Sequence, residues 1–169
     1  MVFHSVTRRK FASRFASLFS AMGAGALLNT TASAKTSAAH NEEVRKLSED
    51  GTPAAATQFI TPIVAHNGLI YVAGVGAHDE GPSSSWDIGK HTTTVMDKIK
   101  KAVEAGGSSM DNVLQLSVFL GKIDDYDGMN KVFKTYFPHG GPARTTVAVA
   151  ALPGNSLVEV NCIAAVLKK

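Results

Sequence analysis

The sequence predicts an α+β domain with the element order β-β-α-β-α-β-β, folded as one mixed sheet with two helices on one face. Three observations predict it: short apolar runs of strand character, two longer segments with a helical period, and Gly, Pro or Asn at the boundaries between them. The chain has 169 residues, of which 44% are hydrophobic, enough for one domain and a tail. We place this domain at residues 56–169.

The first two strands are predicted as a hairpin. Residues 57–65 are rich in β-branched side chains and lead into His66-Asn67-Gly68, a turn signal. Residues 69–73 form a continuous apolar strand, which ends at Gly74-Val75-Gly76. These glycines lack the third glycine and the following helix of a dinucleotide-binding loop, so we interpret them as a strand end.

A helix is predicted over residues 86–105, with Ser83 to Ser85 as candidate caps and Gly106-Gly107 as its end. Apolar residues recur along it with a period of three to four, which is typical of a helix that buries one face. The predicted inner face comprises Ile88, Thr92, Val95, Met96, Ile99, Ala102 and Val103.

The remaining elements are a strand, a helix and two strands. Residues 113–120 alternate as a strand does, and Asp124 or Asp125 should cap a second helix that Pro138 ends. The last strands are predicted at residues 145–149 and 157–167, joined by a turn at 152–155. The inner face of the second helix comprises Tyr126, Met129, Phe133, Tyr136 and Phe137. Because the strands carry apolar side chains on both faces, we expect a second copy of the chain to cover the other face.

The N-terminal 34 residues are predicted to be a targeting segment. Arg8-Arg9 precedes an apolar run rich in Ala and Gly, and Ala32-Ser33-Ala34 offers a cleavage site. The paired arginines resemble the twin-arginine export signal of bacteria, which predicts a periplasmic or secreted protein without stable membrane insertion after processing. A mitochondrial transit peptide is the alternative, and a membrane anchor is less favoured. Residues 35–55 are small, polar and charged, as in a flexible linker.

Charge and cysteine content narrow the function classes. The net charge of +3 depends on the leader, since its removal leaves 13 basic residues against 14 acidic ones. We therefore expect no nucleic-acid partner. Cys162 is the single cysteine, and the six histidines show no metal-binding spacing, so we predict no metal site.

The last strand carries the candidate chemistry. One of its faces is an apolar stripe that includes Cys162, which we interpret as a core thiol. The opposite face places Glu159 and Asn161 between apolar residues, and Glu is rarely buried without a partner. Arg144 opens the preceding strand, so we expect its guanidinium and the Glu159 carboxylate to share one cleft. A structural ion pair is the alternative interpretation.

The segment PARTTVAVAALPGNSLVEVNCIAAV, from Pro142 to Val166, resembles the C-terminal signature of the Rid family of enamine and imine deaminases. HNGLIYVAGVG resembles the family's first hairpin, and YDGMNKVFKTYF its second helix. The resemblance implies a chorismate-mutase-like fold, a homotrimer with a ligand cleft at each subunit interface, and hydrolysis of a small enamine or imine carboxylate without a cofactor. Arg144 would bind the substrate carboxylate, and Glu159 would hold the attacking water.

The resemblance also assigns the substrate-binding positions Phe59, Ala73, Gly74, Asn130 and Thr146, together with Arg144. Phe59 stands where tyrosine is frequent, Ala73 where serine or threonine is common, and Thr146 where cysteine is frequent. These departures remove polar groups from the implied pocket and leave its arginine. The alternative function is therefore a trimer that binds small carboxylates without transforming them. A chaperone-like or ribonuclease role is a third, weaker hypothesis.

Overall fold

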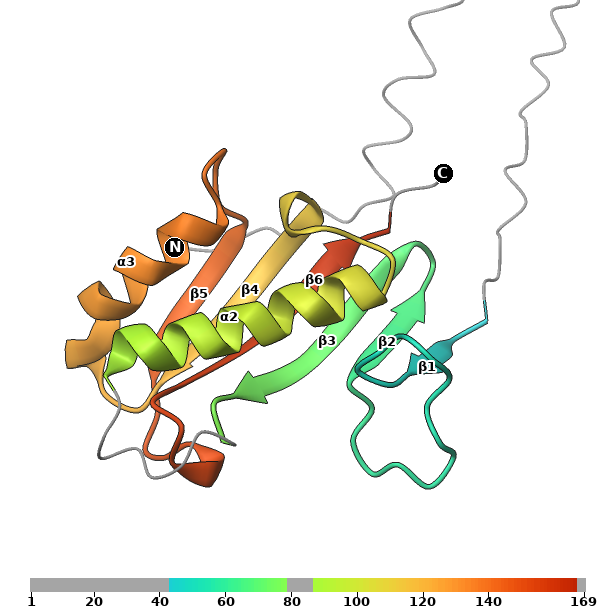
Figure 1. Cartoon of the computed structure of the whole chain (residues 1–169), viewed down its shortest axis with the longest axis horizontal. Coiled ribbons are helices and arrows are strands. Elements are labelled where there is room, and N and C mark those ends of the chain that lie inside the picture. Colours follow the sequence, from blue (N-terminus) through green and yellow to red (C-terminus); the bar gives the residue numbers. More distant parts are fainter. Residues whose placement is uncertain (1–42, 79–86, 167–169) are drawn as a thin grey trace, which may run out of the picture. The chain divides into compact units, whose positions relative to one another are not determined.

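The computed structural model describes residues 43–78 and 87–166. Within them the elements are β1 (Arg45–Leu47), β2 (Ile63–His66), β3 (Leu69–Gly76), α2 (Ile88–Ala105), β4 (Val113–Leu120), α3 (Tyr126–Tyr136), β5 (Ala143–Ala148) and β6 (Val158–Ala165) (Figure 1). From β2 onward this is the predicted order. The leader and the candidate caps Ser83 to Ser85 lie outside the described residues. No helix in the described ranges is long and apolar enough to cross a membrane.

The six strands form one sheet in the order β1-β2-β3-β6-β4-β5. The β4–β5 pair is parallel, and the other four neighbouring pairs are antiparallel, which confirms a mixed sheet. Both helices lie on the same face of this sheet (Figure 1). The order has one consequence for function: β4 lies between β5 and β6, the two strands that carry the candidate chemistry.

Strand β1 lies inside the segment that we expected to be a flexible linker. It pairs antiparallel with β2, and Leu47 is buried in the core. Leu47 also forms an isolated bridge with Pro53. Three residues are too few for a two-residue period to stand out among polar neighbours, which is why the sequence pattern did not reveal the strand. The ordered part of the chain therefore begins before Ala56.

Helix α2 buries the predicted stripe against β3 and β6. Its first turn is capped by Asp87, whose carboxylate accepts a hydrogen bond from the backbone N–H of Lys90 at 2.8 Å. At its end the left-handed residue is Gly107, with φ +88°, whereas Gly106 keeps helical angles. Asn67 and Gly68 both have positive φ, as the predicted hairpin turn requires.

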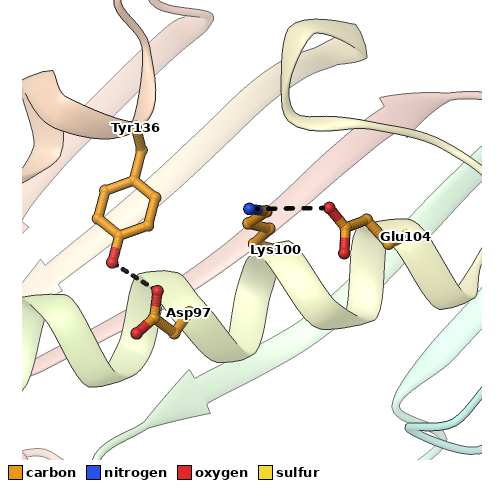
Figure 2. Close-up of polar contacts among 4 residues, drawn as sticks. All are labelled: Asp97, Lys100, Glu104 and Tyr136. Carbon is orange, nitrogen blue, oxygen red and sulfur yellow. Dashed lines mark hydrogen bonds and ion pairs between the residues drawn. The ribbon is translucent and has the colours of Figure 1, made fainter.

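Helix α3 packs beside α2 and covers the β5 side of the sheet. Figure 2 shows the polar link between them: the Tyr136 hydroxyl donates to the Asp97 carboxylate at 2.7 Å. Partial burial and this carboxylate raise the pKa of Tyr136 above its ordinary value, so the phenol stays a donor. Met129 and Phe133 are buried as predicted, whereas Tyr126 is 39% exposed at the margin of the helix.

Candidate functional site

The face of the sheet that carries no helix is called here the open face. Along β6, Val158, Val160 and Cys162 are buried under α2, while Glu159 and Ile163 alternate onto the open face and are half-buried. The register pairs Ile163 with Tyr71, which is 42% exposed. Val147, on β5, is 43% exposed. The open face therefore presents apolar side chains that no element of the described chain covers.

The Glu159 side chain lies over Gly74 of β3. A methyl group at Gly74 would stand 2.5 Å from the Glu159 carboxylate oxygen Oε1, well inside contact distance. Gly74 does not have positive φ, so its backbone does not require glycine. The missing side chain instead makes room for the carboxylate. Glu159 forms no ion pair with any residue that the structure describes.

Buried polar contacts fix the corner of the domain where β3 ends and β6 begins. The Ser156 hydroxyl accepts a hydrogen bond from the backbone N–H of Ala77 at 2.9 Å and donates one to the carbonyl of Val158 at 2.7 Å. The imidazole of His91, buried on α2, accepts from the backbone N–H of Leu157 through Nδ1 at 3.1 Å. These contacts tie the end of β3 and the start of β6 to each other and to α2.

His78 follows this corner, and its ring lies against two glycines. A methyl group at Gly76 would stand 2.5 Å from the ring atoms Cε1 and Nε2, and one at Gly154 would stand 2.4 Å from Nδ1. The sequence reasoning did not single out His78, His91 or Ser156. A signal was available in Gly74-Val75-Gly76, because two glycines at a strand end can mark places where other groups approach closely.

Arg144 lies on the helix side of the sheet, at the β5 edge. Its guanidinium carbon is 4.5 Å from the ring centroid of Phe133 and 5.8 Å from that of Tyr126. Nη2 donates to the Tyr126 hydroxyl at 3.3 Å, and Nη1 lies 3.9 Å from the Met129 sulfur. No carboxylate among the described residues pairs with it. Helix α3 therefore holds an oriented cation that retains N–H groups for an anion.

One chain does not bring Arg144 and Glu159 together, contrary to the expectation of a shared cleft. On β4, Arg144 is in register with Leu116, which is buried under the helices, and Glu159 is in register with Phe119, which faces the other way. Two strand spacings and three residues of offset place the two Cα atoms roughly 14 Å apart. The expectation failed because β5 and β6, though consecutive in sequence, are separated by β4.

The other predicted site residues divide between the two faces. Ala73 precedes Gly74 in β3, where the register with β6 shifts between Val72 and Val75. Asn130 is half-buried on α3, and the Thr146 hydroxyl is buried on the Arg144 side without a hydrogen-bond partner in the described structure. Phe59 lies in neither group, since it is 98% exposed in the β1–β2 connection.

The remaining candidates for chemistry are the single cysteine and groups of potential metal ligands. Cys162 is buried in the core, and burial raises the pKa of its thiol to about 12. It is therefore a packing residue, as predicted. In residues 43–78 and 87–166, no three His, Cys, Asp or Glu side chains gather as metal ligands would.

Comparison with family models matches residues 50–166 to the family described as endoribonuclease L-PSP. The chain belongs to this family. Its relatives include Reactive Intermediate Deaminase A, chloroplastic, of Arabidopsis thaliana, 32% identical over 120 residues, which span 70% of this chain and 64% of that protein. They also include protein mmf2, mitochondrial, of Schizosaccharomyces pombe, 34% identical over 105 residues, which span 60% of this chain and 83% of that one. The predicted membership of the Rid family is thereby confirmed.

Solved structures agree with the fold. Yeast Mmf1 superposes with a TM-score of 0.63 at 27% identity, covering 73% of this chain and 98% of that one. NMB1025 of Neisseria meningitidis, a member of the YjgF protein family, gives a TM-score of 0.64 at 25% identity, covering 77% and 100%. Residues 1–42 hold the predicted leader, and neither these likenesses nor the family match tests it.

Proposed function

We propose that this protein hydrolyses small enamine or imine carboxylates, of the 2-aminoacrylate and 2-iminopropionate type, to 2-oxo acids and ammonia. The reaction takes place in a cleft between two copies of the chain. Arg144 of one copy binds the substrate carboxylate, and Glu159 of the neighbouring copy holds the attacking water. A relative that bears the name Reactive Intermediate Deaminase A supports this class of reaction.

The observation that carries the proposal is the state of Arg144. Its guanidinium is oriented by Tyr126, Met129 and Phe133 and has no acidic partner in the described structure. A fixed, unpaired guanidinium at a sheet edge is suited to a planar carboxylate, which it can grip with two parallel hydrogen bonds. A purely structural arginine would instead be expected to pair with a carboxylate of its own chain.

The chemistry needs few groups. Once an enamine has tautomerised to the imine, water attacks the imine carbon and a carbon–oxygen bond forms. Glu159 accepts the proton that the water releases. The imine reacts in its protonated form, so this addition leaves a neutral carbinolamine. Its nitrogen gains a proton, the carbon–nitrogen bond breaks with its electron pair going to nitrogen, and the hydroxyl oxygen loses its proton to become the carbonyl of the 2-oxo acid. The proton on Glu159 passes to the departing ammonia, which leaves as ammonium. None of these steps requires a metal or an organic cofactor.

Assembly into a homotrimer is part of the proposal. The open face exposes Tyr71 and Val147, and its middle strand carries the half-buried Ile163. Such a surface favours burial against a second copy, because exposed apolar patches commonly mark protein interfaces. A neighbouring copy on this face would also shield Glu159 from bulk water.

The alternative is a trimer that binds small carboxylates without transforming them. Ala73 favours it, because it has a methyl group where a serine or threonine would place a hydroxyl next to Gly74. A ribonuclease role, as in the family description, has less support because the chain without residues 1–34 has no excess of basic residues.

The test is ammonia release from freshly generated 2-iminopropionate, measured with the full-length chain. Wild type should exceed the buffer rate, and Arg144→Ala should abolish the excess. Arg45→Ala is the matched control, because Arg45 is an exposed arginine on β1 and should be dispensable. A wild-type rate equal to that of buffer would refute the enzyme. Stabilisation of wild type but not of Arg144→Ala by 2-oxobutyrate would then support the binding alternative.

The destination of the protein follows from its leader. We propose twin-arginine export to the periplasm, with mitochondrial import as the alternative. The relatives named mitochondrial and chloroplastic favour the organelle alternative. Fusing residues 1–34 to a folded reporter and replacing Arg8-Arg9 by Lys-Lys separates the two. Twin-arginine export should fail with the lysine pair, whereas mitochondrial import should tolerate it because the charge is unchanged.

A further inference from the structure

We propose that His78 donates the proton to the leaving nitrogen, acting beside Glu159. This inference rests on the proposed function and adds a catalytic residue to its site. It starts from Gly74 and Gly76, which are two residues apart at the end of β3. Neither has positive φ, so neither needs to be glycine for the backbone's sake.

Each of these glycines is covered by a side chain that can carry a proton. The Glu159 carboxylate occupies the space of a side chain at Gly74, and the His78 imidazole occupies that of a side chain at Gly76. Any larger residue would displace one of them. The absence of side chains at Gly74 and Gly76 thus leaves two neighbouring spaces, one filled by a carboxylate and one by an imidazole.

The spaces above Gly74 and Gly76 are on the same face of the sheet. Gly76 is in register with Glu159, and opposite residues of an antiparallel pair direct their side chains to the same face. The imidazole over Gly76 therefore lies on the open face, as the Glu159 carboxylate does. The two side chains form no ion pair in the described structure. They flank the same piece of strand without neutralising each other.

His78 is exposed, but the backbone that leads to it is anchored. The preceding residue, Ala77, is buried and bonded through its backbone N–H to Ser156. The other side of the ring faces Gly154, where a methyl group would stand 2.4 Å from Nδ1. An imidazole held between two glycines is oriented by the backbone, as a residue that transfers protons to one substrate atom must be.

Water adds to the carbon of the protonated imine, and Glu159 takes one of its protons, which leaves a neutral carbinolamine. The imidazolium of His78 gives its proton to the amine nitrogen, the carbon–nitrogen bond breaks with its electron pair going to nitrogen, and ammonia departs. An oxygen lone pair forms the carbonyl, and the hydroxyl proton returns to His78. Glu159 passes its proton to ammonia, so imine cation and water yield 2-oxo acid and ammonium.

The test is chemical rescue. His78→Gly should leave an imidazole-sized slot between Gly76 and Gly154. We expect turnover of 2-iminopropionate to fall at least 10-fold and to recover in a concentration-dependent way with added imidazole. His139→Gly is the matched control, because His139 is also exposed and lies in the turn after α3. Its rate should equal wild type with and without imidazole.

Two further measurements keep the inference falsifiable. Gly76→Ala retains the imidazole but displaces it, so its turnover should also fall while its melting temperature stays near wild type. In His78→Gly, binding of 2-oxobutyrate should persist, since Arg144 is untouched. An active wild type whose His78→Gly variant is equally active, or is not rescued, overturns the role of His78 alone. An inactive wild type overturns the proposed function and this role together.

Discussion

Two inactive variants should restore each other's activity when they assemble together. Arg144→Ala lacks the carboxylate anchor and Glu159→Gln lacks the group that activates water, so each alone should be inactive. Within one chain the two residues lie on opposite faces of the sheet, roughly 14 Å apart by strand spacing and register. The proposed site combines one copy's arginine with the neighbour's glutamate. A mixed assembly contains such sites, although neither parent does.

The size of the recovery follows from counting interfaces. In a ring assembled at random from equal amounts of the two variants, half of the interfaces receive an intact arginine. Independently, half receive an intact glutamate, so about one quarter of the sites are complete in a closed cyclic assembly. Coexpression of the two chains with different tags, followed by purification over both tags, gives mixed assemblies. This purification removes assemblies made of one variant only, and each mixed trimer then holds one complete site among three. Their turnover of 2-iminopropionate should therefore approach one third of the wild-type rate per chain.

The controls decide what a failure means. Mixing Arg144→Ala with Arg144→Lys tests for recovery that arises without complementary sites, and none is expected beyond the activity of Arg144→Lys alone. A double variant that carries both substitutions in one chain, coexpressed with wild type, tests whether inactive copies poison intact neighbours. If coassembled single variants are confirmed by both tags and remain inactive while wild type turns over, the two-copy site is refuted.

The remaining predictions concern single positions. Gly74→Ala should push the carboxylate above it aside by about 1 Å and lower kcat/KM about 100-fold with little change in melting temperature. Gly68→Ala should lower stability and leave activity unchanged. Gly68 has φ +74° and open space around it, so the substitution should cost about 1 kcal/mol and lower the melting temperature by roughly 4 °C. Tyr126→Phe should weaken 2-oxobutyrate binding about 5-fold by calorimetry, because it loses the hydroxyl bonded to the guanidinium, whereas Tyr136→Phe on the same helix should not. Cys162, with a thiol pKa of about 12, should stay unreactive toward a thiol reagent at pH 8 until the protein unfolds.

Most of the fold could be predicted from local patterns. Residues 113–120 alternate and lie between a glycine-ended helix and a helix predicted to start at Asp124 or Asp125, and β4 occupies those residues in the structure. The buried stripe of α2 from Thr92 to Val103 could be predicted equally well, because burial of one helical face imposes its period directly on the sequence. His91 was missed because a buried histidine that bonds a backbone N–H leaves no periodic trace of its role.

The strand order could not be taken from proximity in sequence. We expected β5 and β6 to be neighbours because consecutive strands often pair. The better signal was the helix between β4 and β5: a strand, a helix and a strand make a crossover, which places the second strand parallel to the first. That rule makes β5 parallel to β4, and in the structure β5 is the edge strand beside β4, with Arg144 under α3. The candidate residues were thus placed wrongly relative to one another, and their roles stay a prediction.

The placement that separates the two groups also explains why assembly and activity would be one event. In a single copy the Glu159 carboxyl is half-buried on a face that water reaches, where hydration weakens its interaction with a reacting water or nitrogen. Strand alternation determines which face Glu159 is on, because any residue at this position of β6 faces away from the core that α2 covers. The chain itself provides no element to cover that face in its described part. A neighbouring copy would supply both the missing cover and the missing arginine, so loss of the interface should abolish turnover even where each copy remains folded.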